Sequence, residues 1–138
     1  MAAVRDVIRS GGSLDSDTAI TEVARLLGFR RAGNRIRGEL RSALRTATRR
    51  HIITRENGVI RIECATIDDY SREELIEALL TTIGNTWWKR GDAIRAAVRR
   101  LGFRRTGPRM TQAFKSAING AIRRGLLEFD KELIRRCK

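Results

Sequence analysis

The chain has 138 residues and a formal net charge of +13, from 29 Lys and Arg against 16 Asp and Glu. Hydrophobic residues make up 41% of the chain. No apolar run approaches the roughly 18 residues of a membrane-spanning helix, and the N-terminal residues lack the apolar core of a signal peptide. The composition therefore argues against a membrane protein and predicts a cytoplasmic one, nucleoid-associated if bacterial, with an anionic partner.

The charge is distributed unevenly along the chain. Residues 1–64 carry 13 basic and 7 acidic groups, residues 65–86 carry 1 and 5, and residues 87–138 carry 15 and 4. Two basic segments around an acidic joint are expected of two modules that face a polyanion. Only four of the basic residues are Lys. This arginine bias favours forked contacts to phosphate and guanine, although a genome rich in G and C would produce it as well.

The N-terminal half predicts helices followed by a β-hairpin. We expect the first helix from Ala2 to Ile8 or Arg9. A later helix carries an apolar stripe at helical spacing, which consists of Ile36, Leu40, Ala43, Leu44 and Ala47. Residues 51–55 and 59–62 then flank Asn57-Gly58, the strongest short signal for a hairpin turn. His51, the only histidine, is expected at the start of a strand in a structural role.

The second half predicts the same plan. Ser71 and Glu74 form a capping box that should begin a helix, and Gly84-Asn85 should end it. Residues 86–89 predict a short extended segment, and a second helix should run from about Asp92 to Gly102. A third helix should start near Pro108 and bury Met110, Ala113, Phe114, Ala117, Ile118 and Ala121. Residues 126–134 can form two short strands around a turn.

An internal repeat links the two halves. The segment Leu27-Gly28-Phe29-Arg30-Arg31-Ala32-Gly33 returns in the second half as Leu101-Gly102-Phe103-Arg104-Arg105-Thr106-Gly107, and an ungapped alignment around it keeps many further identities. We therefore predict a mainly α, α+β protein of two tandem winged helix-turn-helix domains that arose by internal duplication. The predicted domains are residues 1–64 and 65–138, with 65–71 as a linker.

The repeated pattern Leu-Gly-Phe-Arg-Arg-x-Gly-x-Arg, followed by an amphipathic helix and a hairpin, resembles a small winged-helix-like domain of unassigned function. That domain lies at the C-terminal end of large bacterial proteins related to superfamily-one helicases, some associated with restriction and phage defence. The resemblance covers about 45 residues of each copy. It implies a binding module of such a machine, because this chain has no Walker-type loop and no nuclease motif.

The third helix of each copy is the predicted DNA-binding element, with its exposed side in the major groove of double-stranded DNA. Phosphate is also favoured at its N-terminus by free amide groups and by the helix dipole. The predicted DNA-binding residues are Arg30, Arg31, Arg35, Arg41, Arg45, Arg49 and Arg55 in the first copy, and Arg104, Arg105, Arg109, Gln112, Lys115, Asn119 and Arg123 in the second. Gly38, Ser42 and Ser116 share the same helix faces, and Lys131 lies at the second hairpin tip.

Each of these features also has a structural interpretation. The polar helix faces can be ordinary solvated surfaces. In the repeated loop, Phe29 and Phe103 can pack into the core, the glycines can permit a tight turn, and one Arg per copy can cap a neighbouring helix. Trp87 and Trp88 can stack on single-stranded bases, but we expect one to pack in the core and the other at a domain interface.

Catalysis and metal binding are not expected. One His and the separated Cys64 and Cys137 do not match zinc-ligand spacings, and two thiols so far apart in the sequence indicate a reducing compartment. The acidic groups near the joint, Asp68-Asp69 and Glu73-Glu74, are best explained as charging a helix N-terminus. We therefore predict a non-enzymatic DNA-binding protein without cofactor, small-molecule substrate or membrane contact. A protein-interaction module within a larger helicase- or restriction-type assembly is the main alternative, and RNA binding is a third.

Overall fold

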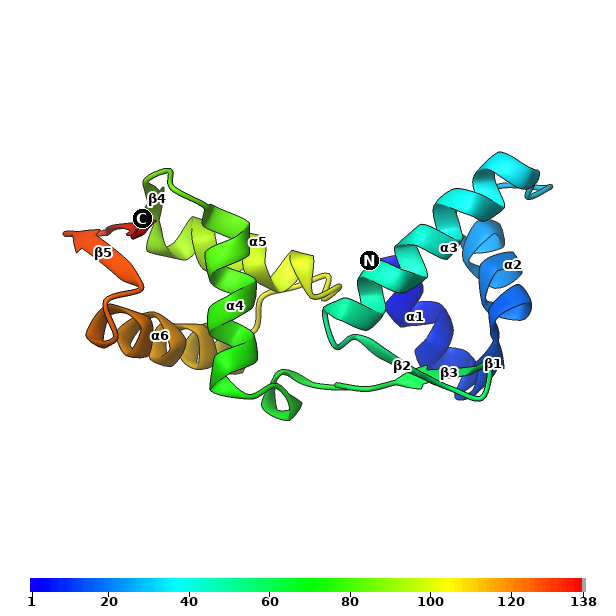
Figure 1. The fold of residues 1–138 in the computed structure, drawn as a ribbon, viewed down its shortest axis with the longest axis horizontal. Helices are drawn as coiled ribbons and strands as arrows, with labels where there is room; N and C mark the ends of the chain where they lie inside the picture. Colours follow the sequence, from blue (N-terminus) through cyan, green and yellow to red (C-terminus); the bar gives the residue numbers. More distant parts are fainter. Residues whose placement is uncertain (138) are drawn as a thin grey trace. The chain divides into compact units, whose positions relative to one another are not determined.

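The computed structural model describes residues 1–137 and divides the chain into two compact units, Met1–Ala65 and Thr66–Lys138, here unit 1 and unit 2. Within the described residues each unit contains three α-helices and one antiparallel three-stranded sheet (Figure 1). The predicted α+β class is confirmed. None of the helices in residues 1–137 combines the length and the apolar character that crossing a membrane requires.

Unit 1 begins with two helices separated by a short strand. Its elements are α1 (Ala2–Gly11), β1 (Leu14–Asp15), α2 (Ser16–Leu26), α3 (Asn34–Arg49), β2 (Ile53–Glu56) and β3 (Val59–Ile62). Strand β3 lies between β1 and β2 and pairs antiparallel with both. The turn residues Asn57 and Gly58 both have positive φ, 52° and 78°, as the tight hairpin turn favoured by Asn-Gly requires. The predicted hairpin is confirmed.

The core of unit 1 lies where its three helices meet the sheet. Ile8 of α1, Ile20 of α2 and Leu44 of α3 converge with Ile53 and Ile60 of the hairpin, and all five are buried. These side chains come from the apolar stripe of each helix and from one face of each strand, which is how amphipathic elements bury apolar surface. The packing leaves the opposite side of α3 exposed.

One charged residue belongs to this core. Arg5 of α1 is fully buried, and its Nη1 donates a hydrogen bond to the carbonyl oxygen of Cys64 over 2.6 Å. A buried guanidinium requires hydrogen-bond acceptors, because an unpaired charge in the interior is costly.

Unit 2 has the same order of main elements. They are the 3₁₀-helix η1 (Ile67–Asp69), α4 (Arg72–Ile83), β4 (Trp88–Lys89), α5 (Arg90–Arg100), α6 (Pro108–Arg123), β5 (Leu127–Asp130) and β6 (Leu133–Arg136). The sheet order β4-β6-β5 matches β1-β3-β2. From β1 onward, every helix and strand of unit 1 has a counterpart of the same length in unit 2, and the offset between their bounds is constant.

Several boundaries differ from the predictions, and helix α1 runs to Gly11 rather than ending at Ile8 or Arg9. Helix α5 begins at Arg90 rather than near Asp92. His51 has φ 61° directly after α3, and β2 begins only at Ile53, so the prediction that His51 starts a strand was wrong. The supposed linker 65–71 contains η1, whose Ile67 is buried and which packs against α6. It is therefore largely part of unit 2.

The repeated Leu-Gly-Phe segment ends the second helix of each unit. Gly28 and Gly102 have φ of 92° and 83°, a conformation that favours glycine. The backbone N–H of Phe29 then donates to the carbonyl of Ala24 over 2.9 Å, and that of Phe103 donates to Val98 over 3.2 Å. The glycine of the repeat thus has a structural explanation as a helix C-terminal signal.

Helix α4 is fixed at its start by two contacts involving acidic side chains. The predicted capping box is present: Ser71 Oγ accepts from the backbone N–H of Glu74, and Glu74 Oε1 accepts from that of Ser71. The neighbouring Glu73 Oε1 lies 2.6 Å from Nη1 of Arg124 at the end of α6. The hydrogen bond from Arg124 lowers the pKa of Glu73 below its ordinary value of 4.5.

This ion pair predicts an acid-dependent loss of stability in unit 2. Because the pKa of Glu73 is lower in the folded chain, the pair stabilises the fold above about pH 4.5 and the stabilisation disappears as the pH falls through the lowered pKa. In Glu73→Gln we expect a smaller decrease of the urea midpoint between about pH 5 and 2.5 than in the wild type. Urea denaturation followed by tryptophan fluorescence measures this midpoint at each pH, because Trp87 and Trp88 both lie in unit 2.

The matched control is Glu77→Gln. Glu77 is an exposed acid on the same helix and has no ion pair among residues 1–137. If Glu77→Gln changed the decrease of the urea midpoint with falling pH as much as Glu73→Gln did, the Glu73–Arg124 contact would not be the cause of that decrease.

Candidate nucleic-acid interface

The exposed face of α3 is the most basic helix surface of unit 1. Arg41, Arg45 and Arg49 recur every four residues, so they lie along one side of the helix, and all three are exposed. Leu44 and Ala47 on the other side are buried. Within residues 1–137, Arg49 Nη2 donates a hydrogen bond to Thr46 Oγ1 on the same helix over 3.1 Å. No acidic side chain lies on this stripe, which is called the α3 arginine stripe below.

The loop that leads into α3 adds two further cations. Arg30 and Arg31 are exposed, and Gly33 is the N-cap residue without a side-chain hydrogen bond. The first N–H groups of α3 therefore have no side-chain cap and remain available to an anion. Arg35 in the first turn has its Nε 3.7 Å from Glu39 Oε1, with 93% of its side chain exposed. A pair so exposed holds Arg35 only weakly.

The hairpin supplies the seventh predicted residue of unit 1. Arg55 is exposed in β2, two residues before the Asn57-Gly58 turn. All seven predicted residues of unit 1 are therefore solvent-exposed, in the loop, along α3 and on the hairpin.

The corresponding face of α6 has fewer charges and more amides. Gln112, Lys115, Asn119 and Arg123 are all exposed on the side opposite buried Phe114 and Ala117. Lys115 and Asn119 also line a cavity of about 260 Å³ at the start of α5. This face can donate and accept hydrogen bonds through its amides, whereas the α3 arginine stripe can only donate them.

Other polar residues near α6 are engaged within unit 2. Nε of Arg109 lies 2.7 Å from Asp68 Oδ2, so this predicted DNA-binding arginine is paired with a carboxylate of η1. Ser116 Oγ accepts a hydrogen bond from Arg72 Nη2 over 2.8 Å. Arg104 and Arg105 are exposed in the preceding loop. Ser116 is therefore engaged within unit 2, whereas Arg109, with 80% of its side chain exposed, is held only weakly by its ion pair.

The sequence prediction missed Arg90. Its side chain lines the same cavity as Lys115 and Asn119, and its Nε is buried without a hydrogen-bond partner among the described residues. Its Cζ lies 6.0 Å from the ring centroid of Phe129. The predicted start of this helix near Asp92 placed Arg90 in the segment before it. As the first residue of α5 it instead faces the basic side of α6.

The expected packing of the aromatic residues is partly wrong. Neither tryptophan is buried: Trp87 is 38% exposed beneath Arg135, whose Cζ lies 4.5 Å from its ring, and Trp88 is half-buried in β4. Phe103 is buried, but Phe29 is 45% exposed. The repeated phenylalanine therefore packs into the interior in unit 2 only.

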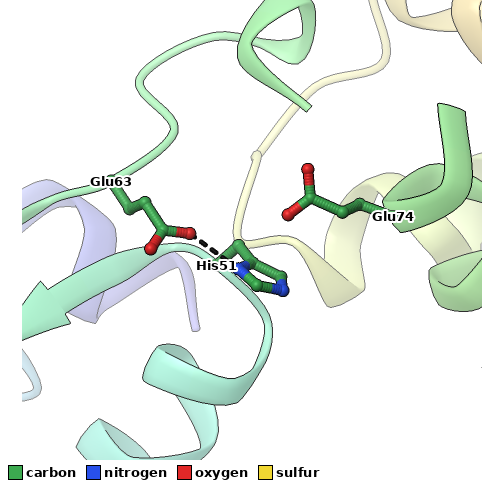
Figure 2. Close-up of side chains that lie close together, drawn as sticks. All are labelled: His51, Glu63 and Glu74. Atoms are coloured by element: carbon green, nitrogen blue, oxygen red, sulfur yellow. Dashed lines mark hydrogen bonds and ion pairs between the residues drawn. The ribbon is translucent and has the colours of Figure 1, made fainter. Parts of the chain in front are cut away.

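His51 has a local contact within unit 1. Its Nδ1 lies 2.7 Å from Glu63 Oε2, and the dashed line in Figure 2 marks this contact. The corresponding position in unit 2 is Gly125, with φ 73°. His51 thus occupies a left-handed position after a helix, where the Glu63 contact fixes its side chain, and its expected structural role stays a prediction. Glu74, the third residue of Figure 2, is the capping residue of α4 described above.

A comparison of the chain with profiles of known protein families, with curated proteins and with solved structures finds no match.

Proposed function

We propose that the chain is a pair of winged helix-turn-helix domains, related by duplication, that binds double-stranded DNA chiefly through its phosphates. The observation that carries this proposal is the α3 arginine stripe, a continuous row of exposed guanidinium groups opposite a buried apolar stripe. A helix presented in this way can enter a major groove while its other side stays in the core. Guanidinium groups also suit forked contacts to phosphate.

The arrangement of elements supports the winged-helix assignment. Each unit places a helix, a short strand, two helices and a hairpin in that order, and the short strand pairs with the second strand of the hairpin. In such a fold the third helix is the recognition helix and the hairpin is the wing. The constant offset between corresponding elements supports the duplication. The resemblance to the winged-helix-like domain of helicase-related proteins belongs to this proposal.

The two third helices suggest different roles. The α3 stripe has only Arg side chains, which suits contact with the phosphate backbone of any sequence. On α6, Gln112 and Asn119 are amides that can pair bidentately with adenine, beside Lys115 and Arg123. We therefore assign more of the affinity to unit 1 and more of any base preference to unit 2.

A competition experiment tests the kind of nucleic acid. A fluorescein-labelled duplex DNA bound to the chain is challenged with unlabelled duplex DNA, single-stranded DNA and duplex RNA, and anisotropy reports displacement. We expect duplex DNA to compete at least tenfold better than the other two, because the major groove of A-form RNA is too narrow for side chains and a single strand offers no groove. Equal or better competition by single strands would contradict the proposal and favour stacking on Trp87.

A further inference from the structure

Unit 1 exposes three large apolar side chains that follow one another closely in the chain. Leu26, Leu27 and Phe29 are 53%, 53% and 45% exposed at the end of α2 and in the turn after it. Together they form the α2 apolar patch. Leu26 also lines a groove between α1 and α2. A cluster of exposed apolar residues of this kind often marks an interaction site.

Unit 2 shows what packs on the residue that corresponds to Phe29. Leu101 and Phe103, the counterparts of Leu27 and Phe29 in the repeat, are only 2% and 9% exposed. The ring of Phe103 packs edge-to-face on Tyr70, with centroids 6.4 Å apart. Tyr70 directly follows η1, whose Ile67 is buried as well. A short segment with an apolar residue and an aromatic one therefore packs where unit 1 has exposed surface.

The same segment also pairs charges. Asp68 of η1 lies 2.7 Å from Arg109 in the first turn of α6. The residue of unit 1 that corresponds to Arg109 is Arg35, which is 93% exposed and has a single ion-pair partner among residues 1–137, Glu39, at 3.7 Å. The position that corresponds to Glu39 in unit 2 is Ala113. Within residues 1–137, Arg35 thus keeps the cation of this position and pairs only with a carboxylate of its own helix.

We propose that the α2 apolar patch and Arg35 bind a short acidic and aromatic segment of a partner protein. Its chemistry is that of Ile67-Asp68-Asp69-Tyr70: an apolar side chain, acidic residues and an aromatic ring within one turn. The ring packs on Phe29, and a carboxylate replaces Glu39 at Arg35. Burial of the apolar surface supplies most of the affinity, and the exposed ion pair with Arg35 orients the bound segment. This inference does not depend on the proposed DNA binding.

A synthetic peptide with the sequence of Ala65–Glu74, labelled with fluorescein, tests this inference on the full chain. We expect saturable binding by anisotropy at low salt. Phe29→Ser should weaken it at least tenfold through loss of the ring contact. Arg35→Gln should weaken it several-fold, and Glu39→Ala should strengthen it several-fold because the competing carboxylate is gone. All three side chains are exposed, so the variants should retain the fold, which circular dichroism checks.

The matched control is Phe129→Ser, which removes an exposed phenylalanine of unit 2 and should leave peptide binding unchanged. A peptide in which Tyr70 is replaced by Ala should bind at least tenfold more weakly. The inference is overturned if the wild type shows no saturable binding up to about millimolar peptide, the weak end of specific affinities. It is also overturned if Phe29→Ser binds as well as the wild type. Duplex DNA binding by Phe29→Ser should stay unchanged, so the two proposals can fail separately.

Discussion

Replacing Arg41, Arg45 and Arg49 together by Gln is expected to weaken duplex DNA binding by about 10²-fold at about 0.1 M salt. These three side chains form the α3 arginine stripe, which is exposed and carries no acid. Each phosphate contact releases close to one counterion, so the slope of log K against log salt should become shallower by about 3. Fluorescence anisotropy with a labelled duplex, repeated over a range of salt concentrations, measures both quantities.

A second triple variant separates the stripe from the overall charge. Arg9→Gln, Arg25→Gln and Arg61→Gln remove the same three charges from α1, α2 and β3, at positions that are also exposed. This control should retain most of the affinity and nearly all of the salt slope. Equal losses in the two triple variants would show that net charge alone, rather than the α3 face, governs binding.

Phe114→Ala is expected to destabilise unit 2 by about 3–5 kcal/mol, the usual range for truncating a buried phenylalanine. Phe114 is fully buried in α6, where its ring lies on the side opposite the polar face. A unit of this size is expected to have a free energy of unfolding of about 4–10 kcal/mol, so the loss is a large part of the total. Urea denaturation followed by tryptophan fluorescence reports the change, because both tryptophans lie in unit 2.

Leu40→Ala is the matched control in unit 1. Leu40 occupies the position in α3 that corresponds to Phe114 in α6 but is only partly buried. Its truncation should lower the midpoint of the circular dichroism transition and leave the midpoint of the tryptophan transition unchanged. A shift of the tryptophan midpoint as large as that of Phe114→Ala would contradict the assignment of separate cores to the two units.

Local signals predicted most of the secondary structure. The capping box at Ser71 and Glu74, the Asn57-Gly58 turn and the start of a helix at Pro108 each depend on residues within one turn of the chain, so the sequence alone identifies them. The exposed side of each third helix also followed from helical periodicity, since the buried residues recur at a fixed spacing. All fourteen predicted DNA-binding residues are indeed exposed.

What the sequence did not predict depends on contacts between distant segments. The pairing of Arg109 with Asp68 requires η1 to pack against α6, and residues 65–71 carried no signal for that packing. The different exposure of Phe29 and Phe103 has the same origin, because Tyr70 packs on the ring of Phe103, whereas Phe29 is 45% exposed within residues 1–137. The core position of Arg5 is likewise set by the carbonyl of Cys64, at the far end of unit 1.

The measurement that tests the central proposal most directly is the salt dependence of duplex DNA binding by the unmodified chain. Anisotropy of a labelled duplex of about 30 base pairs, titrated at several salt concentrations, gives the number of counterions released. Contacts from both units predict a log-log slope that corresponds to about four or more counterions, with binding retained at about 0.1 M salt. Negligible binding at that salt concentration, or a slope near zero, would contradict DNA binding through phosphates.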